Sequence, residues 1–291
     1  MKKILTIYYT QTGQLKRILD SLLRPLSGGP DVSIDYLEIK PVQAFPFPWT
    51  RKEFLSIFPE TVLEAPIALQ PVAVDDDARY DLIILAFQPW YLSPSLPVTA
   101  FLKSPDAVKI LKRVPILTVI GSRNMWQGSL ERVKVMVEAL GGRLCGNIAF
   151  IDRAPNLISV ITIVYWMFTG KKDKYLGIFP RPGVSDEDIA AAAVFGKAIH
   201  TALRDNRLDQ LDHQLRKLGA AEINDSLARL ENRAKKIFGL WAKVILKSPK
   251  IRTSLLNLFM AELIFALIVI SPLNSFFGMI FKLFGKSGEH S

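Results

Sequence analysis

A regular alternation of short apolar runs with segments of helical spacing is the feature that most constrains this fold. Ile4 to Tyr9 is a continuous apolar and aromatic run, which is typical of a strand buried on both faces. Leucine and isoleucine then recur at helical spacing from Leu15 to Leu23, and Pro25 ends the predicted helix. From Val32 to Tyr36, apolar and polar residues alternate as in a half-buried strand. The chain therefore opens with a strand, a helix and a second strand.

The same rhythm continues to about residue 204. Further strands are predicted at Asp81 to Phe87, Pro115 to Ile120 and Leu144 to Ile151, and helices near 98–111, 129–140 and 186–203. Strands that alternate with helices form a parallel sheet with helices on both faces. Five strands in this rhythm predict a doubly wound α/β fold with the strand order 2-1-3-4-5.

The spacing of these patterns divides the 291-residue chain into a domain and an extension. Residues 1–204 carry the alternating pattern and contain irregular insertions at 41–79 and 153–185. Residues 205–291 are expected to form a helical extension. Its first part, 205–236, is rich in charged residues and predicts a solvated amphipathic linker helix.

The loop between the first strand and the first helix carries the clearest functional signal: Thr10, Gln11, Thr12, Gly13 and Gln14. In a doubly wound sheet, ligands bind beyond the carboxyl ends of the strands. The free N–H groups and the dipole of the following helix favour an anion, the two threonines add hydroxyl donors, and the glycine lets the backbone come close. These residues predict a phosphate site, and an ordinary capped turn is the alternative. Neither a P-loop nor a G-x-G-x-x-G sequence is present, which disfavours a nucleoside triphosphate or a dinucleotide.

This loop resembles the Ser/Thr-x-Thr-Gly-x phosphate loop of flavodoxins and related FMN oxidoreductases, since Tyr-Tyr-Thr-Gln-Thr-Gly-Gln stands between a strand and a helix. The resemblance covers residues 2–204 and implies a flavodoxin-like fold with FMN as the cofactor. The family usually has a further Thr or Asn after the glycine, whereas Gln14 and Leu15 follow Gly13 here. The last hydroxyl contact is therefore missing, or the Gln14 amide replaces it.

The resemblance also assigns roles to two further loops. The loop after the third strand stands where flavodoxins carry the residues that stack on or edge the isoalloxazine ring: Gln88, Pro89, Trp90 and Tyr91. The loop after the fourth strand stands where related enzymes contact the flavin pyrimidine: Gly121, Arg123, Asn124 and Trp126. A cation at Arg123 would stabilise an anionic reduced flavin or an enolate oxygen of a substrate. Arg123 and Tyr91 are the catalytic candidates, with aromatic packing and a turn-capping arginine as the alternatives.

The opening sequence together with Arg123-Asn124-Met125-Trp126 resembles a narrower group, the bacterial dialkylresorcinol condensing enzymes. That resemblance implies an aromatase, which oxidises a dialkyl cyclohexane-1,3-dione to the resorcinol. The expected function is an FMN-dependent oxidoreductase for a hydrophobic cyclic ketone or quinone-like substrate. A membrane-associated quinone or porphyrinogen redox enzyme, a non-catalytic electron carrier and a scaffold that has lost its flavin remain the alternatives.

Two apolar segments lie outside the strand and helix pattern. Leu157 to Phe168 is too short to span a bilayer, so it predicts a wall for an apolar substrate, a membrane-dipping segment, a core helix or the surface of a homodimer. Leu255 to Ile270 and Phe276 to Phe284 flank a proline and are bordered by basic residues, which predicts a helical hairpin that enters one leaflet. A soluble helical cap over the substrate and a dimerisation arm are the alternatives. Glu262 disfavours deep burial in lipid.

The formal net charge of +10 allows anionic partners, and its placement beside apolar sequence favours a membrane surface over nucleic acid. No secretory signal is visible, so we expect a cytoplasmic protein, peripheral or monotopic at the inner membrane. The single cysteine, Cys145, predicts a small core residue. Asp75, Asp76 and Asp77 are expected to form an acidic turn, and no metal site is predicted because no histidine accompanies them.

Overall fold

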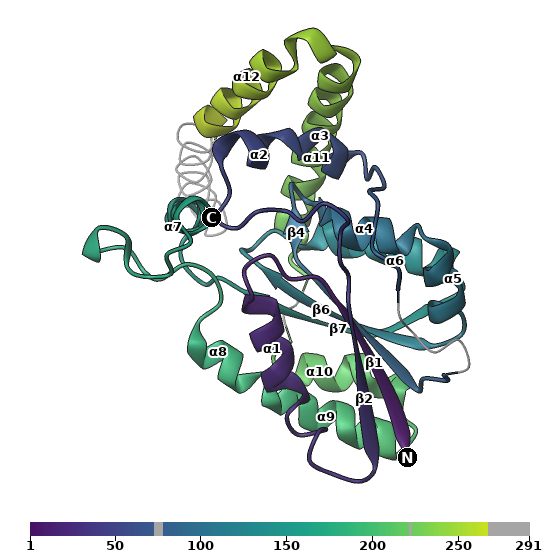
Figure 1. The fold of residues 1–291 in the computed structure, drawn as a ribbon. Coiled ribbons are helices and arrows are strands. Elements are labelled where there is room, and N and C mark those ends of the chain that lie inside the picture. Colours follow the sequence, from purple (N-terminus) through teal and green to yellow (C-terminus); the bar gives the residue numbers. More distant parts are fainter. Residues whose placement is uncertain (73–77, 221–222, 267–291) are drawn as a thin grey trace, which may run out of the picture. The chain divides into compact units, whose positions relative to one another are not determined.

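The computed structural model describes residues 1–72, 78–220 and 223–266. Its centre is a sheet of five parallel strands (Figure 1): β1 (Lys2–Tyr8), β2 (Val32–Glu38), β3 (Leu82–Phe87), β6 (Pro115–Ser122) and β7 (Arg143–Ile151). The strands lie in the order β2-β1-β3-β6-β7, and every neighbouring pair is parallel. This confirms the predicted order of a flavodoxin-like, doubly wound fold.

Helices cover both faces of the sheet (Figure 1). One face is covered by α1 (Gln14–Leu23), α8 (Asp186–Ala191), α9 (Ala193–Arg204) and α10 (Leu211–Lys217). The other is covered by α4 (Leu96–Leu102), α5 (Pro105–Leu111) and α6 (Gln127–Ala139). Successive strand residues alternate between the two cores, so Ile4 packs on the first face and Leu5 on the second. The central strand β3 is therefore apolar along its length, whereas the edge strand β2 alternates apolar with polar residues.

Two predicted helices are each divided in the structure. The helix expected at 98–111 is interrupted before Pro105, where the Ser104 hydroxyl accepts a hydrogen bond from the Ala107 N–H at 3.3 Å and caps α5. The helix expected at 186–203 is interrupted at Ala192. In α9, a Cβ at Gly196 would lie 1.9 Å from the Leu22 carbonyl oxygen, so glycine is what lets α9 approach α1 closely.

The two insertions form short helices and contact one another. The first contains α2 (Arg51–Ser56) and α3 (Phe58–Val62), and the second contains α7 (Asn156–Thr169) and a 3-10 turn at Tyr175–Gly177. The Trp49 N–H donates to the Met167 carbonyl at 2.8 Å, and the rings of Phe54 and Phe168 meet edge to face at 5.6 Å. The two insertions, more than 100 residues apart in sequence, are thus packed together.

The chain divides into two compact units at Ala242/Lys243 rather than after residue 204. The difference arises because Leu211 and Leu215 of α10 are fully buried against β7, so the prediction of a solvated linker was wrong for this helix. A 3-10 turn, Leu208–Gln210, precedes α10. The long helix α11 (Asp225–Lys247) runs from the first unit into the second.

The second unit contains a 3-10 turn, Pro249–Ile251, and α12 (Arg252–Phe265). Most of the predicted apolar hairpin at 255–284, like the acidic turn at 75–77, lies outside the described residues. Within the part of the chain that the structure describes, the length and apolar character needed to cross a bilayer are not found in any helix.

Candidate functional site

The three predicted loops all follow strands at the carboxyl end of the sheet. The first loop joins β1 to α1, and Gly13 stands at the N-cap of that helix with φ +77°. A Cβ built at Gly13 would meet no atom within 4 Å. The glycine is therefore needed for its left-handed backbone, and the space above it is open.

This loop presents unused hydrogen-bond donors. No acceptor among the described residues faces the backbone N–H groups of Thr12, Gly13 or Leu15, and the Gln14 N–H makes only a long bond of 3.4 Å to the Thr12 hydroxyl. The Thr10 Oγ1 atom is buried and has no partner in the described part of the chain. Unpaired donors at a helix start, aided by the helix dipole, form a site for an anion. These residues fit a phosphoryl group.

Gln11 and Gln88 fasten the first loop to its neighbours. The Tyr9 hydroxyl donates to the Gln11 side chain, whose Nε2 donates to the Pro46 carbonyl at 2.6 Å. In the amide orientation that satisfies both neighbours, Gln88 donates to the Tyr9 carbonyl at 2.9 Å and accepts from the Gln11 N–H at 3.2 Å. Their side chains therefore hold the first loop, the second loop and the 41–79 insertion in one arrangement.

The Gln14 side chain has a partner that its sequence position did not indicate. Its amide exchanges two hydrogen bonds with the backbone of Val184, each 3.1 Å long. Lys172 Nζ donates to the same Val184 carbonyl at 3.3 Å, and this ammonium lies 5.3 Å from the centre of the Trp166 ring. Burial lowers the pKa of Lys172, while the Asp186 carboxylate opposes that shift. A cation from the second insertion thus lies beside the start of α1.

Asp152 supports this arrangement from the end of β7. Its buried carboxylate accepts hydrogen bonds from the Ser159 hydroxyl at 2.9 Å and from the Gly183 N–H at 3.2 Å. Gly183 has φ +79°, and a Cβ there would lie 2.8 Å from both Gln14 and Trp166. The residues 183–184 are therefore held against the first loop from two sides. Neither Asp152 nor Lys172 was singled out from sequence, because their bonds to the backbone of Gly183 and Val184 leave no side-chain pattern.

The second loop is a tight hairpin made of β4 (Pro89–Trp90) and β5 (Ser93–Pro94). Its two turn residues, Tyr91 and Leu92, have φ values of +47° and +64°. Two successive left-handed residues match a type I′ turn, which usually contains Asn and Gly. Non-glycine residues in this conformation are strained, so the surrounding contacts must hold them there.

Trp90 lies at the centre of an aromatic group at the edge of the sheet. Its ring meets those of Tyr9, Phe45 and Trp49 nearly edge to face, at 5.8, 5.1 and 5.7 Å between centroids. Trp90 is half-buried, whereas Trp49 is buried. Trp90 lies just beyond the carboxyl end of β3, and aromatic residues of the 41–79 insertion pack against it.

Tyr91 points away from this group toward α2 and α3. Its ring packs against Phe54 and Phe58, and its hydroxyl donates to the Phe54 carbonyl at 2.6 Å. Burial raises the pKa of Tyr91 well above its usual value. The hydroxyl hydrogen is therefore used by Phe54, and Tyr91 would have to leave that carbonyl before donating to a substrate.

The third loop follows β6. A Cβ at Gly121 would lie 3.3 Å from Leu15 Cδ1, so this glycine gives α1 room. Burial lowers the pKa of Arg123, and the Asp152 carboxylate opposes that shift. Asn124 is half-buried, and Trp126 is buried in the core beside the start of α6. Arg123 and Asn124 thus remain candidates for the ring, whereas Trp126 has a packing role.

Glu231 of α11 is a further buried group beside the third loop. Its side chain is 1% exposed, and its Oε2 accepts a hydrogen bond from the Gly128 N–H at 2.6 Å. Burial raises the pKa of Glu231, while the N–H groups at the start of α6 partly oppose that shift. The carboxyl group caps α6 in the manner of an acidic residue at a helix start.

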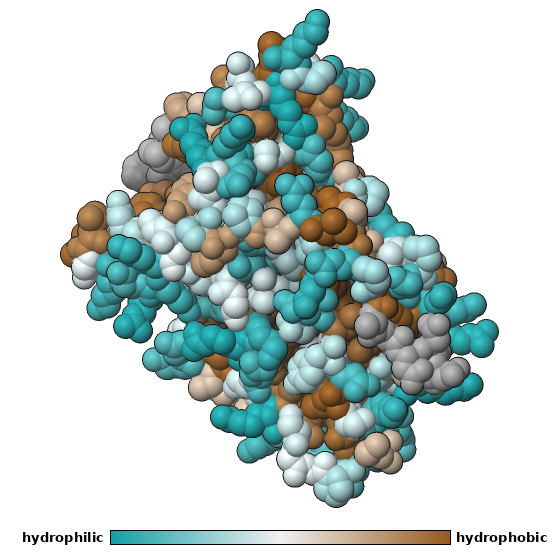
Figure 2. Space-filling view, in the orientation of Figure 1, coloured by the Kyte–Doolittle hydropathy of each residue, from teal (hydrophilic) through white to brown (hydrophobic). Residues whose placement is uncertain are grey.

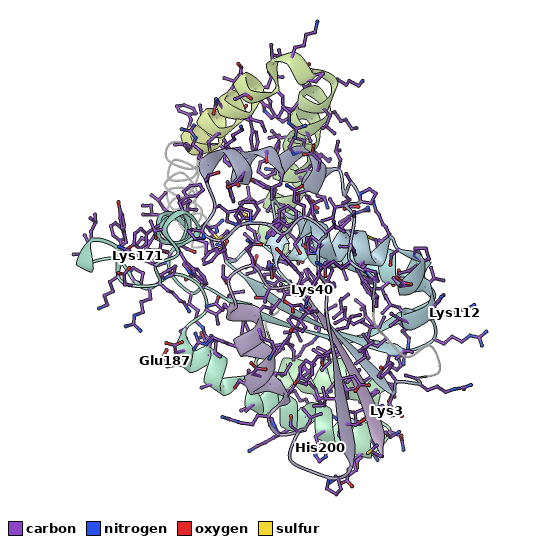
Figure 3. The ribbon with its side chains drawn as sticks, viewed as in Figure 1. Lys3, Lys40, Lys112, Lys171, Glu187 and His200 are labelled. Carbon is purple, nitrogen blue, oxygen red and sulfur yellow. The ribbon has the colours of Figure 1, made fainter. Side chains whose placement is uncertain are left out.

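Two surface hollows lie at the opposite, amino end of the sheet. One, of about 390 Å³, is lined by residues that include Lys2, Asp81 and His200, and the other, of about 380 Å³, by residues that include Tyr80 and Arg113. Figure 3 labels His200 and Lys3 at this end. Neither hollow includes a residue of the three loops. Among the described residues, no group of three or more His, Cys, Asp or Glu side chains is placed to hold a metal ion.

The strand order and the position of these loops define a doubly wound α/β protein of the flavodoxin-like class. Comparisons with protein-family models and with curated proteins gave no match. Among solved structures, the chain is similar to a flavoprotein in complex with FMN from Lactobacillus acidophilus, at 16% identity and a TM-score of 0.42. That alignment covers 51% of this chain and 93% of the other.

Two further similarities have lower scores. A WrbA-like flavodoxin from Agrobacterium tumefaciens is 11% identical with a TM-score of 0.37, over 70% of this chain and 99% of the other. A Fusobacterium nucleatum flavodoxin bound to flavin mononucleotide is 14% identical with a TM-score of 0.31, over 50% and 69%. Because these scores are low, the class rests on the chain's own strand order.

Proposed function

We propose that this protein binds FMN and is a flavin-dependent oxidoreductase. The observation that carries the proposal is the first loop. It combines an open space above Gly13, unpaired backbone N–H groups and the buried, unpartnered Thr10 hydroxyl. It stands at the carboxyl end of β1, beside β3, where flavodoxin-like sheets bind their ligand. A phosphomonoester dianion satisfies all of these donors at once.

The residues of the loop have distinct roles in this proposal. The hydroxyl groups of Thr10 and Thr12 and the N–H groups up to Gln14 hold the phosphate. Trp90 packs against the ring, with Arg123 and Asn124 at its polar edge. Gln11, Gln88 and Pro89 position the loops, as their hydrogen bonds and hairpin pairing support. When bound, the flavin accepts or donates a hydride, and the protein supplies orientation and charge.

For the substrate, we propose a hydrophobic cyclic ketone or quinone-like molecule, with aromatisation of a dialkyl cyclohexane-1,3-dione as the specific reaction. The aromatic group around Trp90 supports an apolar, flat substrate. The mainly apolar helix α7 contributes Trp166, whose ring meets that of Phe47 edge to face at 6.2 Å. Trp166 and the aromatic group around Trp90 together form an aromatic wall. Such a wall excludes water from the hydride acceptor.

Flavin binding tests the proposal directly. The purified protein should be yellow and release FMN on denaturation. Titration of the flavin-free protein should show FMN binding at least about tenfold more tightly than riboflavin, since only FMN carries the phosphate. A colourless protein with no affinity for FMN would end the proposal. Turnover assays with alkyl cyclohexanediones and with quinones then separate the aromatase from a quinone reductase, and absence of turnover with either leaves an electron carrier.

We also propose association with a membrane surface through the basic and apolar C-terminal segments, and a homodimer as the form in solution. The net charge of +10 supports an anionic surface as the partner. Truncation after residue 251, followed by vesicle binding and light scattering, tests both. A truncated protein that binds vesicles as the full chain does would assign the membrane contact to another surface.

A further inference from the structure

The loop 170–182, between α7 and α8, carries large apolar side chains that are exposed to solvent. Leu176 is 69% exposed and Ile178 is 79% exposed, which only Met1 exceeds among the large apolar residues of the described chain. In Figure 1 this loop projects from the end of α7, and in Figure 2 apolar atoms lie at its end with hydrophilic atoms beside them. Exposure of this kind points to a binding surface.

The end of this loop is an ordered turn. The N–H groups of Ile178 and Phe179 donate to the Tyr175 carbonyl at 3.3 and 3.1 Å. The Tyr175 ring packs at 4.6 Å from the ring of Tyr165 in α7 and at 5.7 Å from that of Phe179. These contacts hold the turn on α7 and direct Leu176 and Ile178 into solvent. The two apolar side chains are therefore held in solvent by an ordered turn that packs on α7.

The backbone at this place is strained. Leu176 has φ +53° and is followed by Gly177 at φ +72°, so a leucine occupies the left-handed region that glycine prefers. Both the conformation and the 69% exposure of Leu176 are unfavourable for the free protein. Strain of this type is typical of positions retained for binding.

The charges around the apolar turn identify the partner. Lys171 and Lys174 are exposed, Arg181 follows the turn, and Figure 3 labels Lys171 at the start of the loop. Asp173 is the single carboxylate in this stretch, and it accepts a hydrogen bond from the Tyr165 hydroxyl at 2.8 Å. Cations beside a small apolar tip match the headgroups and acyl chains of an anionic lipid surface.

We infer that the loop 170–182 docks on an anionic membrane by inserting Leu176 and Ile178 between lipid headgroups. A stable protein interface needs about 1,000 Å² or more of buried surface, whereas a tip of two side chains offers far less. The neighbouring cations approach the phosphates of the lipids while the tip enters the acyl boundary. This inference does not depend on flavin binding, because neither Leu176 nor Ile178 belongs to the three loops of the candidate site.

A fluorescent label at the tip tests the insertion. Cys145 is the only cysteine and is buried, so Ile178→Cys in the full-length protein can be labelled selectively with a polarity-sensitive dye. Vesicles of phosphatidylglycerol and phosphatidylcholine should shift the emission to shorter wavelength, and pure phosphatidylcholine should not. The matched control is Val108→Cys on α5, which is 45% exposed and far from the loop in Figure 1. An unshifted tip label, or an equal shift at both sites, would overturn the inference.

Unlabelled variants test how much Leu176 and Ile178 contribute to vesicle binding. Leu176→Ser with Ile178→Ser should weaken co-sedimentation with the anionic vesicles about tenfold or more, whereas Val108→Ser should leave it unchanged. Unchanged binding of the double variant overturns the inference. Light scattering tests whether a second copy of the protein, rather than lipid, contacts the tip. If the full chain is a dimer and the double variant is a monomer, the tip contacts a second copy and the inference is overturned. Retention of FMN is measured on the same samples, so a failure here is distinguishable from a failure of the proposed flavin site.

Discussion

Replacement of Gly13 by alanine perturbs the proposed phosphate site and little else. The φ of +77° is unfavourable for alanine by about 1–2 kcal/mol. The new methyl group meets no atom within 4 Å, so no clash adds to that cost. We therefore expect the free energy of unfolding of the flavin-free protein to fall by about 1–2 kcal/mol. At about 2–4 °C per kcal/mol, thermal unfolding should occur a few degrees lower.

The effect on FMN should be larger than the effect on folding. The methyl group would stand in the open space above the loop, where the phosphoryl oxygens would otherwise meet the N–H groups. Loss of one charge-assisted hydrogen bond costs about 1.5–3 kcal/mol. The affinity for FMN should therefore fall by at least about tenfold. Because riboflavin lacks the phosphate, its affinity should change much less.

Gly219→Ala is the matched control for this variant. Gly219 has φ +86° and also has no atom within 4 Å of a built Cβ, but it follows α10 and belongs to none of the three loops. Fluorescence titration with FMN and riboflavin, together with thermal unfolding of both flavin-free variants, gives the comparison. Equal FMN affinities for the two variants, at equal loss of stability, would refute the assignment of the first loop to phosphate.

Three further outcomes are expected. Lys172→Met should weaken FMN binding by about two- to fivefold and riboflavin binding hardly at all, measured by the same titration, because it removes a cation beside α1. Since burial raises the pKa of Glu231 above 4.5, its contribution to stability is present at low pH and is lost as the pH rises through the raised value. Glu231→Gln should therefore gain stability relative to the parent as the pH rises above 4.5 in urea unfolding, and a difference that does not change with pH would contradict this. Burial raises the pKa of Cys145 to about 12, so a thiol reagent should modify the native protein at pH 8 far more slowly than the urea-unfolded chain.

The sheet could be predicted because buried parallel strands are continuous apolar runs. Ile83 and Leu85 face one core while Leu82 and Ile84 face the other, so β3 has no polar residue to obscure it. The sequence also contained a signal for the break before Pro105, since serine followed by proline is typical of a helix start. The predicted single helix missed it because the apolar spacing continues through the break.

The packing of α10 could not be derived from its own residues. Leucines at helical spacing among charges fit a solvated helix or one that packs along a single stripe. The deciding partner is Gly146 on β7, where a Cβ would lie 3.1 Å from Leu215 Cδ1. A glycine opposite a leucine is a property of two segments, and neither segment shows it alone.

The candidate site was predicted in part for a related reason. The first loop, Trp90 and Arg123 follow from strand ends and residue type, which are local in sequence. The bond between Gln14 and Val184 joins residues 170 positions apart and uses only backbone atoms of Val184. Any residue except proline offers the same backbone N–H and carbonyl at that position, so the contact has no sequence signature.

The two insertions, rather than the sheet, determine what can reach the proposed flavin. The sheet and α1 form only the proposed phosphate site, at a position that any doubly wound fold can offer. The first insertion contacts it through Gln11 and Pro46, and the second through Gln14 and Val184. Both insertions meet at Trp49 and Met167. Since α7 carries the loop 170–182 at its end and contributes Trp166 to the aromatic wall, the same helix joins the proposed lipid contact to the proposed substrate site. An apolar substrate taken from lipid would therefore follow α7, and loss of the lipid contact should raise KM for a long-chain substrate in vesicles without changing kcat for a short, soluble one.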